Sequence, residues 1–286
     1  MGLAAVVTLM ALSELSPAEL DRAFSAHEFI VSEGARRVVI PYRLLSPQKI
    51  EPGQRYPLVV FLHGGGERGS DNRLQLLYFP ELMAQPEHRL RYPCFLVAAQ
   101  CRENHRWVEV AWEDVESTPL ADEPTPELQA VMGIVDELSR KLPIDERRIY
   151  LTGISMGGYG AWELALREPQ RFAKLVPICG GGDERLAARL VNMPTWAWHG
   201  ALDEAVPVVR SRRMIEAIRE AGGRPRYTEL PNVAHNAWTP AYRDPALLDW
   251  MFDRAEHHAS RIAGAVAMLL LLGIAAAGQL MKLVRR

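Results

Sequence analysis

Cysteine is scarce in this chain, which has three among 286 residues: Cys94, Cys101 and Cys179. Three cysteines are too few for a disulfide framework, and no pair of them has the spacing of metal ligands beside a histidine. Cys94 and Cys101 could form a bridge in an oxidising compartment, but burial as small side chains at strand ends is the favoured interpretation. The cysteines therefore predict neither a metal centre nor a cellular compartment.

A strong charge of either sign is also absent, because 33 Lys and Arg residues oppose 35 Asp and Glu residues, for a net charge of −2 at pH 7. Proteins that bind nucleic acid usually carry a marked positive excess, so we expect no nucleic-acid partner. The sequence has no internal repeat, and it is 48% hydrophobic and 24% charged. This is the composition of an ordinary globular protein, and one large domain can fill the length.

The C-terminal region contains a long run without a charged side chain, IAGAVAMLLLLGIAAAGQLM at 262–281. A helix of this length, at about 1.5 Å per residue, extends roughly 30 Å, which matches the hydrocarbon thickness of a bilayer. A soluble helix would need a polar face, and Gln279 alone supplies a polar side chain here. We therefore expect a transmembrane helix at 262–281, with a basic tail to residue 286 and the membrane as a partner.

The sequence indicates less directly which side of the membrane carries the main domain. Three basic residues follow the expected span and two, Arg254 and Arg261, precede it, so the positive-inside tendency favours a cytoplasmic C-terminus and an extracytoplasmic main domain. The opposite topology, a cytoplasmic domain with a tail anchor, stays open. In the N-terminal segment 1–29, the apolar run 2–12 suits either a truncated signal peptide or a short buried helix, because no basic residue precedes it.

Short apolar runs rich in β-branched residues alternate with segments of helical period. The runs are 58–62, 95–99, 149–152, 175–178 and 195–198, and a further run at 37–45 contains Pro41, which favours the edge of a sheet. The helical segments are 126–141, 156–167 and 208–221. Strands that alternate with helices predict an α/β fold, a mostly parallel sheet covered on both faces, within a domain at 30–258.

Residues 153–157 read Gly-Ile-Ser-Met-Gly and fit the pattern G-x-S-x-G. They follow a strand-like run and precede a helix-like segment, which is the setting of a nucleophilic serine on a tight strand-to-helix turn. Side chains at the two glycines would clash in such a turn. The helix N-terminus places backbone N–H groups and the positive end of its dipole beside the serine. Ser155 is therefore the predicted nucleophile.

A serine hydroxyl reacts only when a base takes its proton. In this arrangement the acid and the histidine follow the serine along the chain, each in a loop after a strand. Asp203 follows the strand-like TWAW, and His235 follows the strand-like RYTEL. We predict that His235 is the base and that Asp203 is the acid that orients it. Glu204 is the alternative acid, and His199 is expected to pack within its loop or to cap it.

A glycine-rich loop, His63-Gly64-Gly65-Gly66, follows the strand-like LVVFL. Glycines let backbone N–H groups approach a carbonyl oxygen closely, as an oxyanion hole requires, and loss of one donor costs about 3 kcal/mol. We expect one donor to be the backbone N–H of Gly65 and the other to be that of Met156. His63 is expected to brace the loop rather than to act as a second base.

Four stretches together resemble a known family: LHGGGERGSDN at 62–72, GISMGG at 153–158, the H-G-x-x-D-x-x-V-P pattern at 199–207, and HNAW at 235–238. They look like the polyhydroxybutyrate-depolymerase and feruloyl-esterase-like branch of the α/β-hydrolases, close to the phospholipase/carboxylesterase group. The resemblance implies an α/β-hydrolase fold, esterase activity, and no metal or organic cofactor. It also implies that Glu67 and Arg68 shape the oxyanion loop. The C-terminal span lies outside the shared pattern.

Aromatic side chains occur near the predicted site, and we expect Trp107 and Trp238 to contact substrate. Aromatic walls suit a flat or saccharide-linked ester, although core packing is the alternative for each ring. The sequence thus predicts a serine carboxylic-ester hydrolase acting on a small-molecule or saccharide-linked ester. A peptidase of the prolyl-oligopeptidase type, an acyltransferase and a catalytically inactive, membrane-tethered binding module stay open.

Overall fold

The structure is a computed structural model that describes residues 15–117 and 119–253. The chain divides into two compact units, one ending at Thr239 and the other beginning at Pro240. The expected membrane span at 262–281 and the apolar run at 2–12 lie outside the described residues. Within the described ranges, no helix is both long enough and apolar enough to cross a membrane.

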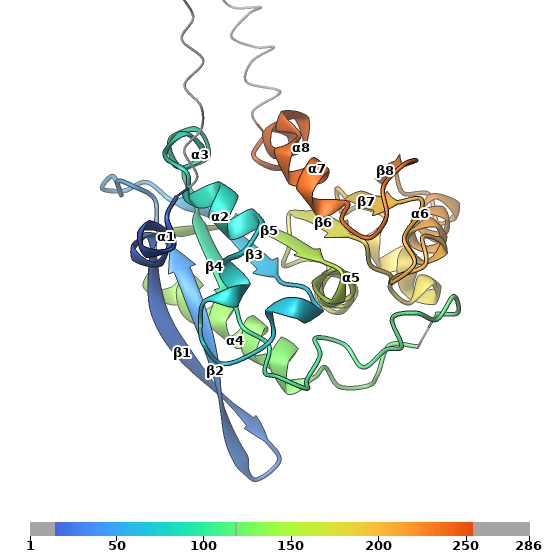
Figure 1. Cartoon of the computed structure of the whole chain (residues 1–286), viewed down its shortest axis with the longest axis horizontal. Helices are drawn as coiled ribbons and strands as arrows, with labels where there is room; N and C mark the ends of the chain where they lie inside the picture. Colours follow the sequence, from blue (N-terminus) through green and yellow to red (C-terminus); the bar gives the residue numbers. More distant parts are fainter. Residues whose placement is uncertain (1–14, 118, 254–286) are drawn as a thin grey trace, which may run out of the picture. The chain divides into compact units, whose positions relative to one another are not determined.

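The first unit is built on an eight-stranded sheet with the order β1-β2-β4-β3-β5-β6-β7-β8 (Figure 1). The strands are β1 (Phe24–Glu33), β2 (Arg36–Leu45), β3 (Tyr56–Leu62), β4 (Phe95–Ala99), β5 (Ile144–Ile154), β6 (Lys174–Ile178), β7 (Trp196–Gly200) and β8 (Arg226–Leu230). All neighbours from β4 to β8 pair in parallel, whereas β1 pairs antiparallel with β2, and β2 with β4. The α/β arrangement expected from the sequence is therefore present.

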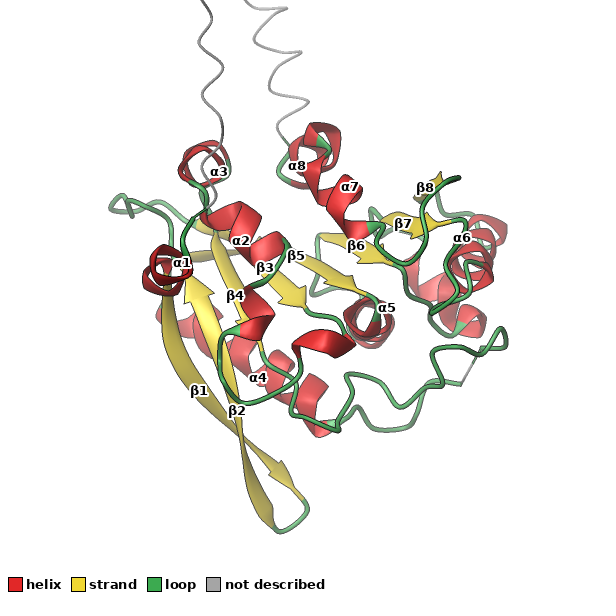
Figure 2. Ribbon diagram, viewed as in Figure 1, coloured by secondary structure: helices red, strands yellow, loops and turns green. Residues whose placement is uncertain are grey.

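Helices flank this sheet, as Figure 2 shows in red against the yellow strands. The helices of the first unit are α1 (Pro17–Ala23), α2 (Phe79–Ala84), α3 (Pro86–Arg91), α4 (Pro126–Lys141), α5 (Met156–Arg167) and α6 (Val209–Glu220), with short 3-10 helices η1 (Gly65–Glu67), η2 (Leu74–Leu76) and η3 (Glu184–Leu190). Two further helices, α7 (Trp238–Arg243) and α8 (Pro245–Met251), end the described chain.

The two faces of β3 show how the sheet is covered. Leu58, Val60 and Leu62 belong to one apolar cluster with buried residues of α4, α5 and α6. Phe61 points to the other face, where its ring stacks on Phe79 of α2 with centroids 5.9 Å apart. Because both faces are buried, β3 is a continuous apolar run, and such a strand is recognisable in the sequence.

Helix α4 illustrates how local sequence sets an element boundary. The hydroxyl of Thr125 caps the N-terminus by accepting from the N–H of Leu128, and Pro126 occupies the first helical position. Arg140 and Lys141 lie in the last turn, where positive charge interacts favourably with the negative end of the helix dipole. The predicted helix and the observed one coincide.

The sheet edge differs from expectation, whereas the cysteines agree with the favoured interpretation. The run with Pro41 is not an edge strand, because β1 pairs along its whole length. Pro41 is tolerated since it falls just before the four residues, Tyr42 to Leu45, that pair with β4. Strand β1 was not predicted. All three cysteines are free and buried, so the alternative disulfide between Cys94 and Cys101 is not formed.

Candidate active site

The parallel strands bring the predicted site residues to one edge of the sheet. The glycine-rich loop follows β3, Ser155 follows β5, Asp203 follows β7 and His235 follows β8. The carboxyl ends of parallel strands lie at a common edge, so loops that are far apart in sequence can meet there. The hydrogen bonds described below show that they do.

Ser155 lies on a strained turn between β5 and α5. Its backbone has φ 54° and ψ −119°, a conformation that is unfavourable for a residue with a Cβ. A Cβ at Gly153 would lie 2.2 Å from the carbonyl oxygen of Gly157, and a Cβ at Gly157 would lie 2.0 Å from that of Leu62. Only glycine fits at both positions, and the turn thereby holds the serine side chain out from the backbone.

His235 joins Ser155 to Asp203 by two hydrogen bonds. Its Nε2 lies 2.8 Å from Ser155 Oγ, and its Nδ1 lies 2.7 Å from Asp203 Oδ2. A carboxylate oxygen only accepts, so Nδ1 carries a proton and Nε2 offers its lone pair to the serine hydroxyl. This is the tautomer that a general base for Ser155 needs.

The carboxylate of Asp203 is buried and surrounded by donors. Its Oδ1 accepts the backbone N–H groups of Ala205 at 3.0 Å and Val206 at 2.9 Å. Burial raises the pKa of Asp203, but hydrogen bonds from His199, His235 and the N–H of Val206 outweigh it and place the pKa well below its ordinary value. Asp203 is therefore ionised at any pH at which the protein would be assayed.

Glu204, the alternative acid, is exposed and makes no contact with His235 among the described residues. The side chain beside the imidazole is that of Asp203. His199 is fully buried in β7, as expected for a packed residue, but it also contacts Asp203, with Nε2 3.2 Å from Oδ2. No motif in the sequence predicts that contact.

The glycine-rich loop presents unpaired backbone donors. Within the described part of the chain, neither the N–H of Gly65 nor that of Met156 has an acceptor. Met156 is the first residue of α5, where the N–H groups have no partner inside the helix. Both are the donors expected for an oxyanion hole, and both are available to a ligand.

His63 braces this loop, as its position in the motif suggested. Its Nε2 accepts the N–H of Cys101 at 2.9 Å, so the proton is on Nδ1, which donates to the carbonyl oxygen of Gly64 at 2.7 Å. The indole N–H of Trp107 donates to the carbonyl oxygen of His63 at 3.0 Å. Burial lowers the pKa of His63 to about 4, so the ring is neutral near pH 7.

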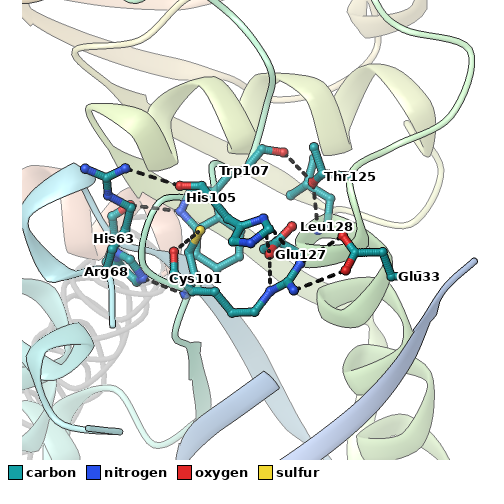
Figure 3. Close-up of polar contacts among 10 residues, drawn as sticks. Glu33, His63, Arg68, Cys101, His105, Trp107, Thr125, Glu127 and Leu128 are labelled. Carbon is teal, nitrogen blue, oxygen red and sulfur yellow. Dashed lines mark hydrogen bonds and ion pairs between the residues drawn. The ribbon is translucent and has the colours of Figure 1, made fainter. Parts of the chain in front are cut away.

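Figure 3 shows how the segment 101–107 is itself held in place. The guanidinium of Arg102 contacts Glu127 of α4 at 2.6 Å and Glu33 of β1 at 3.3 Å. The hydroxyl of Thr125 donates to the carbonyl oxygen of Trp107 at 2.8 Å. The segment therefore joins the sheet edge and α4 to the glycine-rich loop.

Two side chains of the glycine-rich loop itself fit the role implied by the resemblance. Arg68 donates to the carbonyl oxygens of Gly65 at 2.8 Å and His105 at 3.4 Å. Glu67 is buried, and burial raises its pKa, opposed by the backbone N–H of Gly64. Arg68 thus joins the backbone of this loop to that of His105, and the Glu67 carboxylate faces backbone N–H groups of the loop.

Three aromatic residues near the site differ in exposure: Trp107 and Trp238 are buried, and Tyr78 is exposed. Trp107 is wholly buried in the core, which leaves it no surface for a substrate, so that expectation is corrected. Trp238 packs edge-on against His235 at 5.1 Å between centroids. Tyr78 packs against Trp238 at 5.6 Å and is 37% exposed. Tyr78 was not predicted, and its backbone adopts the unfavourable φ of 67°.

One group of side chains among the described residues gathers atoms able to bind a metal: Cys179, His199 and Asp203, whose ligand atoms lie within 4.8 Å of one another. Each is already engaged. Asp203 accepts from His235, His199 faces Ser211, and the thiol of Cys179 donates to the carbonyl oxygen of His235 at 3.1 Å. We therefore do not assign these residues as metal ligands.

A family model and a solved structure both relate the chain to esterases. The family model described as phospholipase/carboxylesterase matches residues 49–244. A solved structure of a thermostable esterase is 39% identical, with a TM-score of 0.75, and the match covers 82% of this chain and 64% of the esterase. The chain thus spans a little less than two thirds of that relative. No curated protein matches the chain.

More distant structures share the fold. A ferulic acid esterase is 15% identical with a TM-score of 0.59, covering 80% of this chain and 98% of the other. An acylaminoacyl peptidase is 18% identical with a TM-score of 0.56, covering 81% of this chain and 41% of the peptidase. These similarities concern architecture alone. The family match spans most of the sheet and the site, and the chain belongs to the phospholipase/carboxylesterase family of α/β-hydrolases.

Proposed function

We propose that the protein hydrolyses carboxylic esters through an acyl-enzyme formed on Ser155. The observation that carries the proposal is the pair of hydrogen bonds at His235, 2.8 Å to Ser155 Oγ and 2.7 Å to Asp203 Oδ2. This geometry supplies a nucleophile, a base in the required tautomer and a charge that stabilises the base once it is protonated.

The reaction would proceed in two halves. Ser155 Oγ attacks the ester carbonyl carbon while His235 Nε2 takes the hydroxyl proton, and the carbonyl oxygen becomes an oxyanion that accepts the N–H groups of Gly65 and Met156. The tetrahedral intermediate collapses, and His235 gives its proton to the departing alcohol. Water then attacks the acyl-enzyme, with His235 again as base, and releases the carboxylic acid and the free serine.

An ester is favoured over an amide by the relative at 39% identity, an esterase. The peptidase in the comparison shares only the fold, so nothing specific supports peptide cleavage. We propose a small-molecule or saccharide-linked ester as substrate, with Trp238 beside the reacting centre. Membrane attachment through 262–281, with the catalytic domain outside the cytoplasm, stays a proposal that cell fractionation and protease protection would test.

Hydrolysis of short p-nitrophenyl esters by the full chain tests the proposal. Ser155→Ala should remove essentially all turnover, leaving only the small residue due to the oxyanion donors. Ser70→Ala, at an exposed serine in the same glycine-rich region, is the matched control and should hydrolyse like the wild type. Wild-type turnover in Ser155→Ala would overturn the proposal. Proline peptides and acyl-acceptor alcohols in the same assays would reveal a peptidase or a transferase.

A further inference from the structure

His199 is a second histidine on the carboxylate of Asp203. It lies in β7 with no exposed surface. Its Nε2 is 3.2 Å from Asp203 Oδ2 and 3.0 Å from the carbonyl oxygen of Val206. Both oxygens are acceptors, so Nε2 must carry a proton, because an unprotonated nitrogen would present its lone pair to theirs. His199 therefore donates to the predicted catalytic acid.

Four donors consequently surround one carboxylate. Oδ2 receives an N–H from His199 on one side and from His235 on the other, while Oδ1 receives the two backbone N–H groups described above. A carboxylate in this setting cannot rotate without breaking hydrogen bonds. Its charge is also divided between two imidazoles, so less of it acts on His235 than if His235 were its single side-chain donor.

The ring of His199 is held from behind by α6. Its Nδ1 lies 2.8 Å from Ser211 Oγ, and that hydroxyl, itself buried, lies 2.8 Å from the carbonyl oxygen of Gly180, so its one proton is shared between these two acceptors. These contacts fix the plane of the imidazole and hence the direction of its Nε2–H. His199 thus lies between a rigid helix and the catalytic carboxylate.

The other charged and titratable groups around His199 come from three elements. Cys179 follows β6, and burial raises the pKa of its thiol far above the assay range, so it stays neutral. Glu229 of β8 pairs in register with His199 but forms an ion pair with Arg212 of α6 at 2.5 Å. Among the described residues near His199, Asp203 is therefore the one charge that no Lys or Arg side chain neutralises.

We propose that His199 is a positioning residue for ester hydrolysis, which holds Asp203 Oδ2 in line with His235 and takes a share of the carboxylate charge. The inference rests on the proposed function of Ser155, His235 and Asp203. His199 touches neither the serine nor a substrate, so it acts only through Asp203. Two consequences separate this role from simple packing, one in the rate and one in its dependence on pH.

Loss of the His199 donor frees Asp203 to rotate, so kcat falls while KM, which reflects substrate contacts, stays nearly constant. Loss of a hydrogen bond to a charged group corresponds to about 10- to 100-fold in rate. The full carboxylate charge then acts on His235 and favours its protonated form, which cannot take the proton of Ser155. The acid limb of the pH profile of kcat/KM therefore moves to higher pH.

Three substitutions test these consequences. His199→Gln places an amide N–H where the ring Nε2–H was, so it should keep most of the activity and the wild-type pH profile. His199→Asn reaches only the Nδ1 position, toward Ser211, and should lose about 10- to 100-fold in kcat. His199→Leu removes both groups and should behave like the asparagine variant. His88→Leu, at a half-buried histidine of α3, is the control and should leave the kinetics unchanged.

The comparison of Gln with Asn remains informative if the leucine variant does not fold, since both amides are polar and of similar size. Rates are expressed per serine labelled by a fluorophosphonate, so a partly folded sample does not imitate a catalytic defect. Equal kcat in the Gln and Asn variants, with the acid limb unmoved in both, would overturn the proposal. Full activity of the Ser155→Ala variant would instead refute the proposed function.

A measurement that needs no catalytic activity also tests the proposed role of His199. Histidine ¹⁵N NMR of the full chain, with the His199 signal assigned through the glutamine variant, should show a protonated Nε2 coupled to one hydrogen across the neutral pH range. An unprotonated Nε2 at His199 would overturn the proposal, whatever the serine does.

Discussion

His63 Nδ1 lies 2.7 Å from the carbonyl oxygen of Gly64, and this contact fixes the direction of the next N–H group. In a trans peptide the C=O and the following N–H point in opposite directions. Because His63 holds the carbonyl oxygen of Gly64 toward the imidazole ring, the N–H of Gly65 points away from that ring. In that direction the N–H of Gly65 has no acceptor among the described residues. The second nitrogen of the ring is held by Cys101.

The loss of kcat on substitution of His63 should therefore depend on which ring nitrogen's hydrogen bond the new side chain retains. His63→Asn keeps a donor at the Nδ1 position, and His63→Gln keeps an acceptor at the Nε2 position for Cys101. We expect His63→Gln to lose about 10- to 100-fold in kcat with little change in KM, and His63→Asn to lose much less. Both leave one buried polar group unpaired, so their stabilities should fall by similar amounts, about 1–3 kcal/mol each. Steady-state kinetics beside chemical denaturation measures both. A larger loss of kcat in the asparagine variant would contradict this account.

The low pKa of His63 predicts a specific loss of stability in acid. Its pKa is about 4 in the folded protein and 6.5 in the unfolded chain. The contribution of His63 to the free energy of unfolding is fully present above pH 6.5, because the imidazole is then neutral in both the folded and the unfolded chain. It is lost as the pH falls toward 4, because the unfolded chain then binds a proton at this residue and the folded protein does not. The loss is at most about 3 kcal/mol. Urea denaturation between pH 7 and 4 should show the wild type losing this amount relative to His63→Asn, which does not titrate. His27→Asn, at an exposed histidine, should parallel the wild type.

Tyr78 stores backbone strain beside the candidate site. Its φ of 67° and ψ of −106° are unfavourable for any residue with a Cβ. Tyr78→Ala and Tyr78→Gly both remove the ring, but only glycine relieves the strain. The glycine variant should therefore be the more stable of the two by about 1 kcal/mol. Both should lose kcat/KM to the same extent on esters with bulky acyl groups, because the ring that packs against Trp238 is gone from each. If the alanine variant is as stable as the glycine variant, the strain is not real.

The identity of the acid is tested by two carboxylates that are neighbours in the sequence. Asp203→Asn should keep the fold and lower kcat on the order of 10⁴-fold, because an amide favours the wrong tautomer of His235. Glu204→Gln should change kcat little, because Glu204 is exposed and does not contact His235. The opposite ranking in steady-state kinetics would identify Glu204 as the acid.

The interior strands and the long helices were predictable because their signals are local. Strand β4 and helices α4 and α5 have the predicted bounds, since burial on both faces makes a strand continuously apolar and capping residues mark a helix. Strand β1 escaped prediction because most of its side chains are exposed, which leaves no apolar pattern. Its pairing with β2 is a property of the folded sheet.

The site was predictable to the extent that it lies in motifs. Ser155, Asp203 and His235 each follow a strand in the expected order, and the structure brings them together. The remaining contacts join residues that no motif links. Cys101 reaches His63 across 38 residues, Ser211 reaches His199 across 12, and the ring of Tyr78 meets that of Trp238. Trp107 was misassigned because an aromatic residue in a loop near the site has the same sequence pattern whether it points outward or into the core.

Covalent trapping at Ser155 tests the central claim most directly. A fluorophosphonate mimics the tetrahedral intermediate and reacts only with a serine that has a base beside it. After incubation of the full chain with this reagent, mass spectrometry of the proteolytic peptides should place one adduct on Ser155, with hydrolysis of p-nitrophenyl acetate lost in proportion. His235→Ala should react far more slowly, because the base is gone. Full inhibition with the adduct on another serine, or unimpaired hydrolysis by a protein labelled at Ser155, would contradict the account.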